Sequence, residues 1–150
     1  MRARRVKGLD AGMAFREAVE RVIAVRAAEV DGFREAARDP GDVDALHDMR
    51  IAAKRLRYAY EIAEPCLGAE AKRGARRARA LQDLLGEIHD CDELVPLVRR
   101  HRKRLRDLDV AAIREGRPPP HRTSYRGLAT LESELMAKRD LLYARFLEEW

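Results

Sequence analysis

The residues from Leu46 to Pro65, LHDMRIAAKRLRYAYEIAEP, form the stretch that decides the fold. In a helix, residues three, four and seven positions apart lie on one face. The apolar side chains of this stretch follow that spacing and form one wide arc: Leu46, Met49, Ala52, Ala53, Leu56, Ala59, Tyr60 and Ala63. The pattern predicts an amphipathic helix with one face in a core.

A second face of the same predicted helix is cationic. At about 100° per residue, an arc of roughly 80° holds His47, Arg50, Lys54 and Arg57. Exposed helix faces usually mix acids with bases, yet no acid occurs between Ile51 and Tyr60. The residue types leave two interpretations open: a binding site for an anion, and an ordinary solvated charged face.

The composition is that of a helical protein with one domain. The chain has 150 residues, of which 46% are hydrophobic, 38% charged and only 5% aromatic. Its length is enough to bury a core, and its formal net charge of +5 makes an anionic partner plausible. The sequence has no apolar run long enough to predict a membrane helix. The basic residues 1–9 are not followed by the apolar segment of a secretory signal. We therefore expect a cytoplasmic protein in which Cys66 and Cys91 are free thiols.

The rest of the chain predicts four more helices. Apart from the central helix at 42–64, capped by Asp42 or Asp44 and stopped by Pro65, helices are expected at 10–38, 69–88, 92–114 and 124–150. Asp10 is a candidate N-cap for the first, and the sequence EGRPPP after Arg114 predicts a loop. Short links between the helices indicate an all-α antiparallel bundle.

The basic charge is concentrated in the central helix and the one that follows. Between Arg50 and Arg79 the sequence has nine basic residues and three acids. The resulting net charge of +6 exceeds that of the whole chain. If the two helices pack antiparallel, the second supplies another basic wall. Lys72, Arg76 and Arg79 share a face and are the preferred candidates, beside Arg73 and Arg77. A further basic run, RRHRKRLR at 99–106, covers too much of its helix to lie on one wall.

The sequence HDCD at 89–92 predicts a break between the third and fourth helices, with an aspartate as the cap. Its residue types could also bind a metal, but adjacent residues at a helix start seldom converge on one ion. Capping and ion pairs with arginines are the favoured interpretation. We see no phosphate loop, nucleophile with its base, or paired carboxylates, so we expect no enzyme, metal or cofactor.

Two motifs in the right order resemble the CHAD family, the conserved histidine α-helical domains. HDMRIAAKRLRY begins at His47 and LQDLLGEIHDCD begins at Leu81. The resemblance implies a helical domain over 10–150, preceded by a basic arm at 1–9, that binds inorganic polyphosphate through a basic groove. The family usually has two helical halves in tandem, and this chain carries the motifs of one. Association of two copies as a homodimer, through Leu142, Phe146 and Trp150, is a further hypothesis.

The residues expected to bind polyphosphate come from two helices. They are His47, Arg50, Lys54, Arg55, Arg57 and Tyr58 of the central helix, with Lys72, Arg73, Arg76 and Arg79 of the next. Arginine can bind phosphate through two parallel hydrogen bonds, whereas lysine acts as a compact charge. His47 could contribute a pH-dependent cation or could instead cap or pack, and Tyr58 could bind phosphate or fill the bundle.

The expected role is targeting to polyphosphate granules or to enzymes of polyphosphate metabolism. Nucleic acid is the rival partner, because its backbone offers the same phosphate charge. The scarcity of aromatic residues for base stacking argues against it. A phosphohydrolase accessory domain or a purely structural adaptor is the other alternative.

Overall fold

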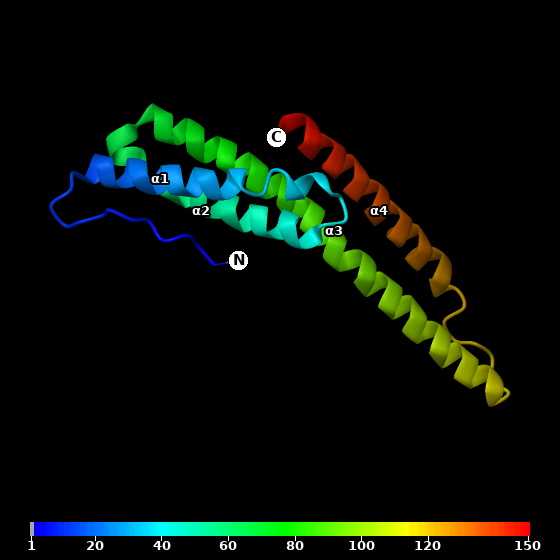
Figure 1. The fold of residues 1–150 in the computed structure, drawn as a ribbon. Helices are drawn as coiled ribbons and strands as arrows, with labels where there is room; N and C mark the ends of the chain where they lie inside the picture. Colours follow the sequence, from blue (N-terminus) through cyan, green and yellow to red (C-terminus); the bar gives the residue numbers. More distant parts are fainter. Residues whose placement is uncertain (1) are drawn as a thin grey trace. The chain divides into compact units, whose positions relative to one another are not determined.

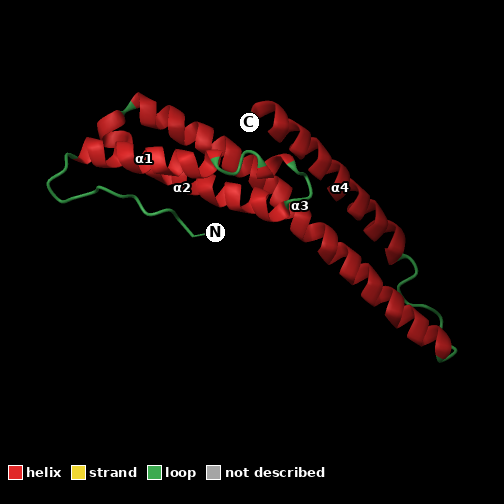
Figure 2. Cartoon of the chain, viewed as in Figure 1, coloured by secondary structure: helices red, strands yellow, loops and turns green. Residues whose placement is uncertain are grey.

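The computed structural model describes residues 2–150, and within them the regular secondary structure is helical throughout. Four α-helices are present: α1 (Phe15–Asp31), α2 (Val43–Leu67), α3 (Ala69–Arg114) and α4 (Ser124–Glu149) (Figure 1). A short 3₁₀ helix, η1 (Ala36–Arg38), follows α1. Figure 2 shows helices and loops alone across the described chain. The all-α prediction is confirmed, but the expectation of five helices is wrong.

The predicted break at residues 89–92 does not occur, because α3 runs without interruption for 46 residues. Asp92 forms an ion pair with Arg139, at 2.6 Å between its Oδ1 and the arginine Nε. Cys91 is buried, with 2% of its surface exposed. Asp92 is therefore paired with α4 and Cys91 lies in the core, and neither residue caps a helix. The helix also continues through Pro96, although proline removes one backbone hydrogen bond.

The ends of α1 and α2 differ from expectation in opposite directions. The first helix is shorter than predicted, because Ala14 occupies its N-cap and Asp10 instead accepts from the Gly12 N–H at 2.8 Å. Asp42 does cap α2, accepting from the Ala45 N–H at 2.9 Å. Pro65 lies inside the last turn of α2 and does not stop it. Gly68 follows with a φ of 54°, a left-handed conformation that glycine adopts without strain.

The chain divides into two compact units. The first comprises the residues up to Gly86 together with Phe146–Trp150, and the second comprises Glu87–Arg145. In the first unit α1, α2 and the beginning of α3 lie side by side (Figure 1). Alanines are fully buried along these helices, at Ala52, Ala53, Ala63 and Ala71. Because alanine is small, the helix backbones can approach one another closely.

The predicted core is largely confirmed. In α3, the apolar residues that recur at helical spacing are buried throughout: Ala71, Ala78, Leu81, Leu84, Leu85 and Ile88. Val95 is buried too, whereas Leu56, Tyr60 and Leu135 are half-buried. Phe146 is buried and the Arg77 guanidinium lies 5.4 Å from the centre of the Trp150 ring, both within the first unit. These two residues are thus already engaged inside the chain, and the homodimer stays a prediction.

A buried carboxylate attaches the N-terminal arm to α1. Glu29 is 1% exposed, accepts from the backbone N–H of Arg4, and pairs with Arg26 at 2.7 Å. Burial alone raises the pKa of the Glu29 carboxyl, but the hydrogen bonds from Arg26 and Arg4 and the charge of Arg55 outweigh it and lower that pKa. The carboxylate is therefore ionised in the folded protein. The arm also contacts α1 at Gly8, whose carbonyl accepts from Arg21 at 2.8 Å.

The second unit is a helical hairpin. The loop after Arg114 begins where EGRPPP predicted it, and Gly116 has a φ of 74°. Ion pairs join the two helices of this unit, with Glu132 accepting from Arg99 at 2.6 Å and from Arg102 at 2.7 Å. Lys138 reaches Glu87 at 3.0 Å. Within the described residues, no helix is both long enough and apolar enough to cross a bilayer.

Candidate anion-binding surface

The predicted basic walls of α2 and α3 lie together in the first unit, because the two helices pack antiparallel. Arg57 of α2 donates from Nε to Oε1 of Gln82 in α3, at 3.0 Å. Its Nη1 also lies 3.0 Å from Glu61 Oε1, one turn further along α2. Arg79 of α3 contacts that same oxygen at 3.3 Å. One carboxylate therefore holds two guanidinium groups, one from each helix.

A further ion pair joins the two helices at the next turn. Lys72 of α3 lies 3.2 Å from Glu64 of α2. Arg76 is exposed and, by helical spacing, lies between Lys72 and Arg79 on the same face of α3. Arg73 is exposed, one residue beyond Lys72. The structure thus confirms that Lys72 and Arg79 lie along the edge of α3 that faces α2.

Arg50 lies at the other end of this surface, against Gly86 of α3. A Cβ atom placed on Gly86 would be 3.3 Å from Arg50 Nε. That Nε is buried and has no hydrogen-bond partner among residues 2–150. A glycine at this position lets the guanidinium lie close to the α3 backbone. His47 is half-buried one turn earlier in α2, and its suggested role stays a prediction.

Tyr58 adds an exposed aromatic ring to the cationic face of α2. The residue is 44% exposed. The Arg57 guanidinium lies 4.5 Å from the ring centre, and Lys54 Nζ lies 6.0 Å from it. Cation–π attraction at this range keeps the two cations near the ring. Tyr58 therefore does not fill the bundle; it supports the charges beside it.

Arg55 differs from the other predicted binding residues. Its charge lowers the pKa of Glu29, after the stronger effects of burial and of the hydrogen bonds to that carboxyl. Arg55 is therefore near α1 and half-buried, while Lys54 and Tyr58 are exposed. The placement indicates a structural role for Arg55, and its contact with polyphosphate stays a prediction.

We call the residues that form the cationic face across α2 and α3, without Arg55, the α2/α3 basic surface. It consists of Arg50, Lys54, Arg57, Tyr58, Lys72, Arg76 and Arg79. Glu61 and Glu64 lie on the same surface and were missed as part of the site. The four-residue spacing from Arg57 to Glu61 could have indicated the first of them. The pairing of Glu64 with Lys72 depends on how the helices align, and that is not visible in either helix alone.

The side chains of residues 89–92 do not gather around one point. Asp92 pairs with Arg139, and Cys91 is in the core, where burial raises the pKa of its thiol. Among the described residues, no cluster of three or more His, Cys, Asp or Glu side chains has the arrangement of a metal site. The ion-pair part of the favoured interpretation is confirmed for Asp92, and the capping part is wrong.

An all-α unit with basic residues on two adjacent helices defines the class of protein, an α-helical domain with a cationic surface. The CHAD domain family matches residues 3–99, more than half of the chain. The chain therefore belongs to the CHAD domain family, as its two motifs indicated. It has no significant match among curated proteins or solved structures.

Proposed function

We propose that this protein binds inorganic polyphosphate on the α2/α3 basic surface and catalyses no reaction. The observation that carries the proposal is the joining of Arg57 and Arg79, from two helices, at the single carboxylate of Glu61. This contact aligns cations of both helices along one surface. Membership of the CHAD family supports the choice of polyphosphate as the ligand.

The charges on this surface suit a linear polyanion. The surface has six cations and two acids, so it keeps a net positive charge after its internal ion pairs are counted. Arg50 and Arg57 are seven residues apart, which is about 10 Å along a helix, and so are Lys72 and Arg79. Two parallel rows of cations of that length can contact several successive phosphates. Each guanidinium can also bind two oxygens at once.

The ion pairs within the surface help to organise it. Lys72 and Arg79 have side chains that are 57% and 59% exposed, so their pairs with Glu64 and Glu61 are mostly solvated. Exposed pairs of this kind contribute about 0–1 kcal/mol each. Phosphates can therefore compete for these cations at little cost. The acids hold the side chains in place and give way when the polymer binds.

The experiment is a polyphosphate titration at two or more salt concentrations. The triple variant Arg50→Ala, Lys54→Ala and Arg57→Ala should nearly abolish binding and flatten the dependence of log K on log salt concentration, by analogy with counterion release from nucleic acids. The matched control changes Arg100, Arg104 and Arg114 to alanine. These three are exposed residues of α3 in the second unit. Circular dichroism checks that both variants stay helical.

Two outcomes would overturn the proposal. Equal loss of affinity in the two triple variants would mean that net charge alone attracts the polymer. Duplex DNA that competes as well as polyphosphate, per phosphate, would favour a nucleic-acid partner. If polyphosphate binding holds, recruitment to polyphosphate granules or to polyphosphate-metabolising enzymes is the cellular role that we propose.

A further inference from the structure

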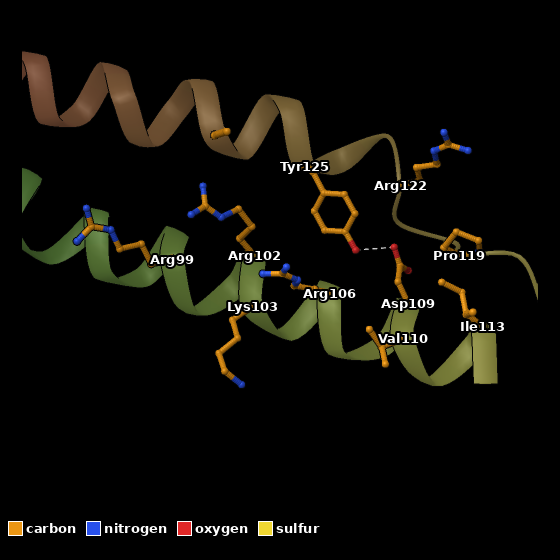
Figure 3. A pocket seen from close by; sticks show the side chains of 11 residues that line it. Arg99, Arg102, Lys103, Arg106, Asp109, Val110, Ile113, Pro119, Arg122 and Tyr125 are labelled. Carbon is orange, nitrogen blue, oxygen red and sulfur yellow. Dashed lines mark hydrogen bonds between the residues drawn. The ribbon is translucent and has the colours of Figure 1, made fainter. Parts of the chain in front are cut away.

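The second unit contains a pocket of its own, of about 610 Å³, between the end of α3, the following loop and the start of α4 (Figure 3). Its volume is in the range typical of small-molecule sites, roughly 300–1,000 Å³. The pocket belongs to residues 99–129, whereas the family match ends at residue 99. It is therefore separate from the α2/α3 basic surface and lies almost entirely outside the part of the chain that defines the family.

One end of the pocket is cationic. Arg99 and Arg102 line it, and both contact Glu132 of α4, whose side chain is 12% exposed. Arg106 lines this end and Arg122 lines the pocket near Pro119 (Figure 3), and neither forms an ion pair with any other residue in 2–150. Glu132 therefore fixes two arginines in position, and Arg106 and Arg122 keep their charge available for a ligand.

The other end of the pocket is apolar. Val110, Ile113 and Pro119 line it (Figure 3). Val110 is 40% exposed and Ile113 is 58% exposed, so both present apolar surface to solvent. The ring of Tyr125 lies between this end and Arg99, Arg102 and Arg106 (Figure 3). A ligand with an anionic end and an apolar body would match both ends at once.

A hydrogen-bond network engages Asp109, the one acid among the residues that line the pocket. Asp109 is 4% exposed. Its Oδ2 accepts from the Tyr125 hydroxyl, and its Oδ1 accepts from the His121 backbone N–H at 3.0 Å and contacts His121 Nδ1 at 2.9 Å. Both carboxylate oxygens are occupied by groups of the protein itself. The network also holds the Tyr125 ring in a fixed position.

We propose that this pocket binds a nucleoside phosphate, with the phosphates at Arg106 and the base against Val110, Ile113 and Pro119. Arginine binds phosphate oxygens, while tyrosine rings and guanidinium planes stack on bases. Inorganic polyphosphate could satisfy the arginines but would leave the apolar end unfilled. The geometry therefore favours an organic phosphate over an inorganic one.

Binding is measured by isothermal titration with ATP, tripolyphosphate and adenosine, in the absence of divalent cations. In the triple variant Arg50→Ala, Lys54→Ala and Arg57→Ala, where polyphosphate binding at the α2/α3 basic surface is nearly abolished, ATP should bind more tightly than either of the other two. The binding of ATP should persist in the triple variant Arg50→Ala, Lys54→Ala and Arg57→Ala, which separates this site from the α2/α3 basic surface. Loss of ATP binding in that variant, or equal affinity for ATP and tripolyphosphate, would overturn the proposal.

Variants of two pocket residues test its two ends. Arg106→Gln should weaken ATP binding about tenfold or more, because a charge-assisted contact is lost. Ile113→Ser should weaken ATP but leave tripolyphosphate unchanged. Arg104→Gln and Leu141→Ser are the matched controls, since both residues are exposed and neither lines the pocket. The proposal fails if ATP does not bind, or if each pocket variant and its control behave alike.

Discussion

The ring of Tyr60 in α2 lies directly on Gly74 in α3. A Cβ atom placed on Gly74 would be 2.4 Å from Cε1 and Cζ of that ring, well inside contact distance. The absence of a side chain at residue 74 therefore allows the close approach of α2 and α3. The same approach brings Arg57 and Arg79 within reach of Glu61. This packing contact between α2 and α3 thus contributes to the geometry of the basic surface.

The variant Gly74→Ala should destabilise the protein. Overpacking of this kind costs about 1–3 kcal/mol, and the better helix propensity of alanine offsets at most about 1 kcal/mol of it. Chemical denaturation followed by circular dichroism measures the difference. The control is Gly127→Ala in α4, where an added Cβ would meet nothing within 4 Å. That change should stabilise the chain by about 0.5–1 kcal/mol, and equal effects of the two variants would contradict the close approach.

The variant Leu85→Ala should lower the free energy of unfolding by about 2–5 kcal/mol, through lost burial and the cavity left behind. Leu85 is 1% exposed in the core of the first unit. Leu141→Ala provides the comparison, because Leu141 is 74% exposed and its truncation removes little buried surface. Thermal melting of both variants is sufficient to check the ranking. A smaller loss for Leu85→Ala than for Leu141→Ala would mean that the core is assigned incorrectly.

The helical class and the core of α3 could be predicted from sequence because they depend on local periodicity. Leu81, Leu84 and Leu85 recur at helical spacing, and all three are buried. The continuity of α3 through residues 89–92 could not be predicted in this way. A local motif with two aspartates is typical of a helix start, whereas Asp92 pairs with Arg139, 47 residues further along the chain, and no local pattern indicates that pairing.

The candidate site was predictable to a similar degree. The spacing of Arg50, Lys54 and Arg57 placed them on one face, and the structure brings Arg57 to the edge of α3. Arg55 is the exception, since it follows Lys54 directly and differs only in facing α1 and Glu29. One residue is a rotation of about 100° on a helix, so neighbours in sequence can serve different surfaces. The pocket of the second unit could not be predicted, because it depends on how α4 returns along α3.

The variant Glu61→Gln should increase the affinity for polyphosphate. The change removes one negative charge and releases Arg57 and Arg79 from their shared ion pair, so both become available to phosphate. The slope of log K against log salt concentration should become steeper by about one contact. Titration of polyphosphate at several salt concentrations measures this slope. Glu134→Gln changes an exposed acid of α4 by the same charge, and a matching gain there would show that only net charge matters.

The hydrogen bond from Tyr125 to Asp109 predicts how the hairpin responds to pH. The bond to Asp109, with burial and the negative charge of that carboxylate, raises the pKa of Tyr125 to about 12. Burial alone raises the pKa of Asp109, but the hydrogen bonds from Tyr125 and His121 outweigh it, so that the pKa of Asp109 is lowered. The carboxylate therefore contributes stability above its ordinary pKa and loses it as the solution becomes acidic. The phenol contributes below the ordinary pKa of tyrosine and loses its contribution as the pH rises towards 12.

The effects of acid and of alkali on this hydrogen bond can both be measured with the variant Tyr125→Phe. Absorbance titration of the wild-type protein should show one phenol that ionises near pH 12, and this step should disappear in the variant. The variant should also melt at a lower temperature at neutral pH, with a smaller difference from wild type at acidic pH, where Asp109 is protonated. Tyr58→Phe is the control, because its exposed ring makes no contact with Asp109, and the late step should remain. If the late ionisation step survives in Tyr125→Phe, it belongs to another tyrosine. The hydrogen bond from Tyr125 to Asp109 would then not hold the Tyr125 ring in the pocket.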